Sequence, residues 1–188
     1  MPDRVDATTP LAPSDAAELV LSFVNTRAIA GSLERLAAGA LMADWLAEVG
    51  LMQADTVVTD ADAATARELR EALVGVLLAH SGAASDGAAE AQLRRSGQQH
   101  PLLPIINSAG ASFLPAQTGA PAAMAAVLAA AAEVALRGTW QRVKACRNPR
   151  CQRGFYDRSR NGSGAYCTPN RCGAQIAMRA YRARRDAR

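Results

Sequence analysis

The sequence predicts a mainly α protein, with a helical N-terminal domain over residues 1–138 and a small cysteine-containing domain over residues 139–188. Three observations support this division. The first part contains alanine-rich segments with apolar residues at helical spacing. All four cysteines lie in the second part, and the sign of the net charge changes between the two parts.

Four helices are predicted in the first hundred residues. Apolar spacing predicts helices over residues 15–30 and 40–49, and Gly50 suits the left-handed residue that often follows a helix. A longer helix is predicted over about residues 60–80. A short helix to about residue 95 follows Asp86, a residue type that caps helix N-termini.

The chain changes character after residue 100. Short apolar runs at residues 102–107 and 111–116 flank Ser108-Ala109-Gly110, which predicts a β-hairpin with a three-residue loop. A long helix then runs from Pro121, which suits the first turn, to about Arg137. The first domain is therefore helical with one small hairpin.

The four cysteines have the spacing C-x4-C-x15-C-x4-C. Two close pairs separated by a hairpin-sized insert suit a tetrahedral four-thiolate zinc site, because each pair supplies two ligands from one tight turn. Disulfides or idle thiols are the alternatives. A complete set of four ligands leaves no position open for water, so one structural Zn²⁺ is predicted. Its ligands are Cys146, Cys151, Cys167 and Cys172.

The order of elements around these cysteines is typical of a treble-clef finger. Strand-like runs at residues 155–157 and 165–167 flank Asn161-Gly162, a strong hairpin signal. Good helix formers follow the last cysteine, over about residues 174–185. The aromatic side chains of this part are expected to form its small core, namely Trp140, Phe155, Tyr156, Tyr166 and Tyr181.

The charge distribution points to a polyanionic partner for the second domain. Residues 1–136 hold 7 Arg against 15 acidic residues, a net charge of −8. Residues 137–188 hold 13 Arg and Lys144 against two aspartates, a net charge of +12. Nucleic acid is the commonest polyanion, and a basic tail docked on the acidic domain is the alternative. The predicted nucleic-acid-binding residues are Arg158, Arg160, Arg171, Arg179, Arg182 and Arg185.

The last three of these arginines recur every third residue on the final predicted helix. They lie largely opposite Ile176, Ala177 and Ala180, so one face is expected to be basic and the other to pack.

A polar triplet, Asn25-Thr26-Arg27, ends the apolar stretch of the first helix. Such residues either line a ligand pocket or satisfy local backbone groups and a neighbouring helix, as Arg70 and Glu71 would allow. The predicted small-molecule pocket residues are Asn25, Arg27 and Arg70. The two histidines are far apart in the sequence, and no role is assigned to them.

The segment from Lys144 to Gly173, KACRNPRCQRGFYDRSRNGSGAYCTPNRCG, resembles the CGNR zinc-finger family. The segments LSFVNT, from Leu21, and LREA, from Leu69, resemble the ABATE domain that accompanies this finger. Members are regarded as stress-induced transcription regulators, so the resemblance implies zinc and DNA binding. The sequence departs from the family where Cys-Gly-Asn-Arg is replaced by residues 172–175, Cys-Gly-Ala-Gln, and where an arginine pair is replaced by Gly164-Ala165.

We therefore expect a zinc-binding transcriptional regulator whose basic finger and last helix contact DNA. The N-terminal domain would sense a small-molecule ligand or mediate association, for example as a homodimer. The alternatives are a protein-interaction or RNA-associated module, or a small-molecule binding protein, each with a purely structural finger.

Several function classes are not expected. The sequence has no glycine-rich phosphate loop, no readable Ser/His/Asp set and no notable carboxylate pair, so it is not expected to be an enzyme. It lacks a signal peptide pattern and a strongly apolar segment of about 20 residues, so a cytoplasmic protein without a membrane span is expected.

Overall fold

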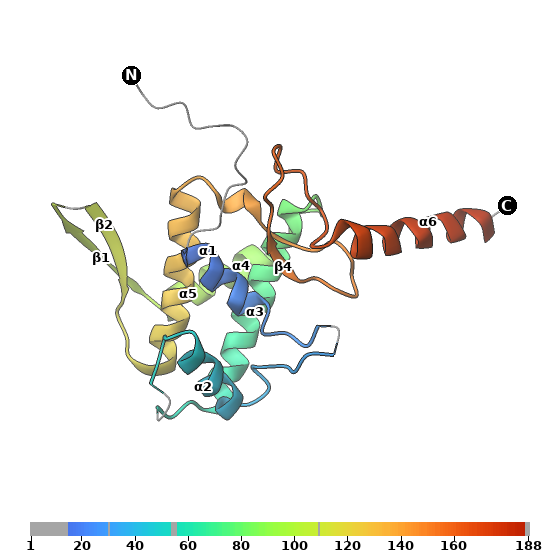
Figure 1. The fold of residues 1–188 in the computed structure, drawn as a ribbon. Coiled ribbons are helices and arrows are strands. Elements are labelled where there is room, and N and C mark those ends of the chain that lie inside the picture. Colours follow the sequence, from blue (N-terminus) through green and yellow to red (C-terminus); the bar gives the residue numbers. More distant parts are fainter. Residues whose placement is uncertain (1–14, 30, 54–55, 109, 187–188) are drawn as a thin grey trace, which may run out of the picture.

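The computed structural model describes residues 15–29, 31–53, 56–108 and 110–186, and it has the mainly α fold that the sequence predicts (Figure 1). The helices are α1 (Asp15–Val24), α2 (Gly39–Glu48), α3 (Asp60–His80), α4 (Gly87–Gln99), α5 (Gly119–Leu136) and α6 (Ala174–Asp186), with short helical turns η1 (Trp140–Arg142) and η2 (Pro169–Gly173). The strands are β1 (Leu102–Asn107), β2 (Gly110–Pro115), β3 (Val143–Ala145) and β4 (Gly154–Tyr156).

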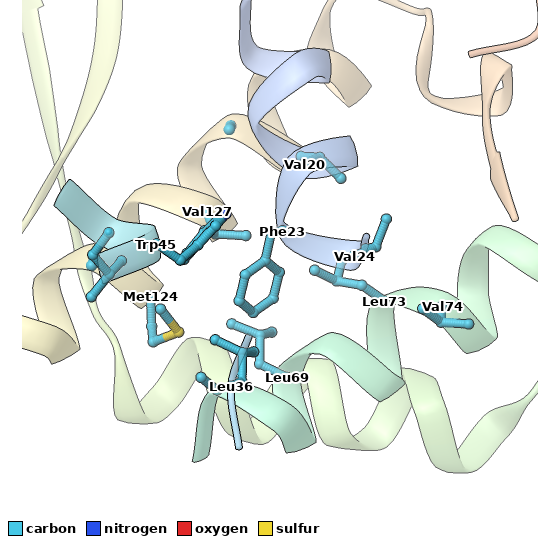
Figure 2. Packing of buried hydrophobic residues seen from close by; sticks show 14 of the residues in the cluster. Val20, Phe23, Val24, Leu36, Trp45, Leu69, Leu73, Val74, Met124 and Val127 are labelled. Atoms are coloured by element: carbon cyan, nitrogen blue, oxygen red, sulfur yellow. The ribbon is translucent and has the colours of Figure 1, made fainter. Parts of the chain in front are cut away.

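One apolar core is built where α1, α2, α3 and α5 meet. Phe23 points from α1 into its centre, and its ring lies 5.5 Å from that of Trp45 on α2 (Figure 2). Leu69 from α3 and Met124 from α5 also lie around the Phe23 ring (Figure 2). Aromatic and aliphatic side chains of this size contribute most of the free energy gained by burial.

Helix α5 is, within the described residues, the helix whose length and apolar composition would allow it to cross a membrane. In the structure it packs against α1 and places Val127 and Val134, both fully buried, in the core. Its many alanines leave room for α1 to approach closely. Core helices of this kind pass the same compositional test, so α5 is weak evidence for a span.

Helix α1 ends at Val24, earlier than the predicted residue 30. The backbone turns because polar side chains satisfy the groups that a longer helix would use. The Thr26 hydroxyl donates to the Phe23 carbonyl (2.7 Å), and the Ser32 hydroxyl accepts from the Ile29 amide (2.9 Å). Competition of this kind commonly ends helices. The end of α1 therefore presents Asn25 outside the helix.

Strands β1 and β2 form the predicted hairpin, but its loop differs from the prediction. Gly110 was expected in a three-residue loop and instead pairs with Asn107 as the first residue of β2, with φ of +140°. Ala109 lies outside the described residues. Strand β2 contacts α5, the far end of the hairpin extends from the body (Figure 1), and apolar residues such as Ile106, 81% exposed, face solvent.

Strand β3, which leads into the first cysteine, belongs to the helical core. Val143 and Ala145 of β3 are fully buried within the same apolar cluster as Phe23. His80 Nδ1 lies 2.8 Å from the Val143 carbonyl, and the Ser81 hydroxyl donates to the Ala145 carbonyl (2.7 Å). Side chains at the end of α3 therefore bond to two β3 carbonyls, as the amides of a neighbouring strand would. The helical core therefore includes residues on both sides of residue 138, the predicted domain boundary.

We predict that Val143→Ala destabilises the helices as well as the finger. The substitution removes two buried methyl groups from the shared core and should lower the free energy of unfolding by about 2 kcal/mol. Thermal unfolding followed by far-ultraviolet circular dichroism should show one transition at a lower temperature. Val57→Ala, at a position that is 85% exposed, is the matched control. A separate finger transition, with unchanged melting of the helices, would contradict the shared core.

Candidate metal centre

The first cysteine pair lies in the turn of a short antiparallel ribbon. Strand β3 pairs with β4, and the Cys146 amide extends this ladder by donating to the Arg153 carbonyl (2.9 Å). The chain between the two strands turns tightly, with the Cys151 amide donating to the Asn148 carbonyl (2.8 Å) and Gln152 at φ of +48°. This knuckle directs both thiols to the same side.

The second pair comes from the entry to the last helix. The amides of Arg171 and Cys172 donate to the Thr168 carbonyl (3.2 and 2.8 Å), forming turn η2, and α6 follows at once. Proline at residue 169 suits the first turn because it needs no amide partner there. Cys167 and Cys172 are thereby brought to opposite ends of one turn and face the knuckle.

The four sulfur atoms have the spacing of a tetrahedral zinc site. All four lie within 4.8 Å of one another. The Sγ atoms of Cys151 and Cys167 are 3.6 Å apart, and those of Cys167 and Cys172 are 3.8 Å apart. A tetrahedron with Zn–S bonds of about 2.3 Å has edges of about 3.8 Å. The four soft sulfur ligands therefore fit a single structural Zn²⁺, as predicted.

The electrostatics of the cluster call for a cation. Burial raises the pKa of Cys146, and burial together with the neighbouring thiols raises the pKa of Cys167 to about 12. Burial also acts on Cys151, but hydrogen bonds from the Arg153 amide and the other thiols lower its pKa. Four thiolates this close repel one another, and a divalent cation at their centre would offset that repulsion.

The loop after β4 is held by a buried ion pair. Lys144, the single lysine of the chain, points from β3 and donates to Asp157 Oδ2 (2.8 Å) and to the carbonyls of Gly162 (2.5 Å) and Gly164 (3.0 Å). Lys144 and Asp157 are both more than nine-tenths buried. Burial alone would raise the pKa of Asp157, but hydrogen bonds from Lys144, Ser159 and Gly164 lower it well below its ordinary value.

This loop replaces the hairpin predicted within the insert. The prediction that residues 155–157 pair with residues 165–167 is wrong, because β4 pairs with β3 instead. Gly162 occupies the turn predicted for it, with φ of +60°. A Cβ atom at Gly164 would lie 2.9 Å from the Asp157 carboxylate, so only glycine fits there without displacing the ion pair. Glycine at this position is thus explained by the loop itself.

The end of α1 clamps the knuckle to the helical part. The Asn25 side chain accepts from the Gly154 amide (2.8 Å) and donates to the Gly154 carbonyl (3.1 Å). A Cβ atom at Gly154 would lie 2.4 Å from Val24 Cγ2, so only glycine lets the helix and β4 approach this closely. The Arg27 guanidinium reaches Gln152 Oε1 (3.0 Å) beside it.

The residues predicted to line a ligand pocket have protein partners in the structure. Arg70 is buried, and its guanidinium bonds to the Thr26 hydroxyl (3.1 Å), to Glu34 (2.5 Å) and to Glu71. Arg27 also approaches Glu71 (3.4 Å). Burial would raise the pKa of Glu34, but its bonds to Arg70 and the Leu36 amide lower it.

Asn25 does border a hollow of about 440 Å³ together with Glu34 and Arg35. Arg27 and Arg70 belong to the ion-pair network instead. A ligand role for the three residues stays a prediction.

All six arginines predicted to bind nucleic acid are exposed. Arg158 and Arg160 lie in the loop after β4, Arg171 lies in η2, and the other three lie on α6. Two further arginines were missed. Arg150 and Arg153 share with Arg171 the rim of a hollow of about 250 Å³ beside Cys151 and Cys167. Their positions on either side of Cys151 in the sequence were the available signal.

Helix α6 projects from the body of the protein, and its main contact is with η2 (Figure 1). The predicted packing face is wrong, because Ala177 and Ala180 are exposed and Ile176 is half-buried. Tyr181, predicted in the finger core, is 57% exposed. Trp140 and Tyr156, assigned to the same core, pack against the helical core instead.

Two comparisons with protein families agree with this geometry. Residues 142–185 match the family model "CGNR zinc finger". Residues 17–138, more than half of the chain, match the ABATE model, described as "Putative stress-induced transcription regulator". The chain belongs to the ABATE family and carries a CGNR zinc finger. No curated protein matches the chain.

The CGNR finger departs from its motif at a position that the structure explains. Gln175 stands where the motif has arginine, and its Oε1 accepts a hydrogen bond from the buried Asn148 side chain (3.1 Å). Asn148 Oδ1 in turn accepts from the Arg150 amide (3.2 Å). Gln175 therefore links the start of α6 to the knuckle.

We predict one zinc per chain in protein purified without added metal. Elemental analysis should give this ratio, and Cys146→Ser should lower it because three sulfur ligands hold zinc more weakly than four. Met178→Ser, on the exposed face of α6, should retain the metal. A folded, metal-free preparation with four free thiols would contradict zinc binding.

We predict that Asp157→Asn lowers the free energy of unfolding at pH 7 by about 3 kcal/mol or more, because it leaves the Lys144 ammonium buried without its counter-ion. The pKa of Asp157 is lowered on folding, so its contribution is present above its unfolded pKa of about 3.9 and is lost as the pH falls below that value.

Urea unfolding of the wild type and Asp157→Asn across pH tests this linkage, with the exposed Asp44→Asn as the control. The difference between wild type and variant should persist from pH 7 to pH 5 and shrink below about pH 4. An equal difference at all pH values would show that the carboxylate charge is not responsible.

Proposed function

We propose that this protein is a DNA-binding regulator whose CGNR finger contacts the backbone of duplex DNA. The observation that carries this proposal is the position of α6. The helix projects from the body, and its arginines at residues 179, 182 and 185 are exposed. An exposed basic helix of this length suits a groove of duplex DNA, with arginines reaching the phosphates on either side.

The knuckle extends the basic surface. Arg150, Arg153 and Arg171 border one hollow, and Arg171 lies directly before the helix in the chain. Backbone phosphates that follow α6 would therefore meet a second group of guanidinium ions. Arginine binds phosphate through paired N–H donors, which suits this role.

The helical part would regulate this contact rather than make it. Its net charge of −8 repels DNA, whereas the Asn25 clamp and β3 fix the finger against it. We further propose a binding protein rather than an enzyme, working in the cytoplasm. The four thiols favour a reducing compartment in which they stay available for zinc.

A protein-docking role for the finger is the second candidate. Met178 and Tyr181 on α6 are 53% and 57% exposed, and residues of these types are enriched in protein interfaces. On this alternative the finger would present α6 to another protein, and zinc would only organise that surface.

A salt titration of the intact protein with duplex DNA tests the proposal. Each arginine–phosphate contact contributes about −0.9 to the slope of log affinity against log salt concentration. Six predicted arginines set the upper limit, and some of them will face away from the DNA. The expected slope is therefore about −3 to −5. Arg179→Ala with Arg182→Ala should make the slope shallower by about 2.

The matched control is Arg94→Ala with Arg95→Ala, which removes the same charge from α4 in the helical part. It should leave the slope unchanged. Absence of binding to any duplex at about 50 mM salt would reject DNA binding, because electrostatic attraction is strong at that concentration.

A further inference from the structure

A second polar hollow lies away from the finger, between α3, α4 and α5. It has a volume of about 260 Å³, with Ala120, Pro121 and Met124 among its apolar lining. Polar groups come from Asp62 on α3, from His100 after α4 and from Gln117 before α5. Pockets that combine an apolar surface with a few converging polar groups commonly bind small molecules.

His100 is the least expected part of this hollow. The residue is 6% exposed, and within the described structure neither ring nitrogen has a hydrogen-bond partner. Burial lowers the pKa of His100, and the nearby Gln117 side chain opposes part of this change. The ring nitrogens thus hold hydrogen-bonding capacity that no described residue uses with good geometry. A buried polar group of this kind costs stability, which a ligand would recover.

The N-terminus of α5 is the second unusual feature. Thr59 and Asp62 cap α3, and Asp86 caps α4. Helix α2 has no capping side chain of its own, but Asp60 accepts its Gly39 amide (2.8 Å). Helix α5 differs. Its N-cap residue, Thr118, makes no side-chain cap, and its first turn holds no acidic residue. A helix N-terminus favours a negative group, which here no first-turn side chain supplies.

We propose that this hollow binds a small α-amino acid with an apolar side chain. The carboxylate would accept from the first-turn amides of α5 and from His100, supplying the missing negative group. The ammonium would face Asp62, which lines the hollow from α3. Met124, Ala120 and Pro121 would contact the side chain.

A zwitterion fits this site better than a simple anion does. Asp62 and the net charge of −8 over residues 1–136 would both repel a ligand that carries only a carboxylate. One Asp62 oxygen, Oδ2, already accepts from the Thr59 amide (2.9 Å) and hydroxyl (2.6 Å), so the carboxylate is fixed in place. The volume is at the small end for ligand pockets, which suits a molecule of this size.

The histidine ring resonances of the intact, zinc-loaded protein report on the site directly. The chain has two histidines, and His80, bonded to the Val143 carbonyl, serves as an internal reference. The probes are L-valine, isovalerate and isobutylamine, which carry both charged groups, the carboxylate alone and the ammonium alone. L-Valine should shift the His100 ring nitrogens saturably at millimolar concentration and leave those of His80 unchanged.

Two variants separate the roles of the polar groups. His100→Phe should abolish the response of the melting temperature to L-valine without lowering the temperature itself, since no hydrogen bond is lost. Asp62→Asn keeps a capping residue at α3 but should weaken L-valine binding by about tenfold, while isovalerate binding does not weaken. Asp60→Asn, two residues earlier on α3 and outside the lining of the hollow, is the matched control and should bind L-valine normally.

Three results would overturn the proposal. These are no saturable shift of His100 with L-valine, isovalerate binding as tight as that of L-valine, and a lower melting temperature for His100→Phe that still responds to L-valine. None of these results depends on whether the finger binds DNA.

Discussion

The burial of β3 is the constraint on which the remaining architecture depends. The three residues of β3, Val143 to Ala145, contribute both to the helical core and to the finger. Val143 and Ala145 enter the helical core, while the Lys144 side chain leaves the opposite face of the strand and orders the loop through Asp157. The next residue is Cys146, the first zinc ligand. The position of the metal is thus determined by packing in the helical part.

The apolar core orders the first part of the C-terminal segment, and zinc orders the rest. The apolar core holds β3 in place. Strand β4 contacts α1 at Gly154, where the Asn25 side chain forms two hydrogen bonds with the Gly154 backbone. The described segment from residue 165 onward contributes no residue to the apolar core, so the ligands Cys167 and Cys172 must fix it. The basic residues on that segment are therefore positioned by the metal, and the helical part can influence them through the knuckle.

Local signals in the sequence predicted most elements, whereas tertiary contacts set the details that it did not predict. The cysteine spacing was sufficient for the metal ligands because each pair is local. The insert hairpin was wrong because Gly162 signals a turn but does not specify which strand β4 pairs with. The exposure of Ala177 on α6 could not be read from its apolar spacing, since no element covers that face. His100 carried no sequence signal at all, because its significance lies in its burial without a partner.

Amide hydrogen exchange with and without a zinc chelator tests the central claim most directly. If β3 belongs to the helical core, the amides of residues 143–145 should stay protected after zinc is removed, because packing and the bonds from α3 hold the strand. Amides of residues 165–186 should lose protection, since the metal orders that segment. Simultaneous loss of protection in residues 143–145 and 165–186, with the helices unchanged, would contradict the account.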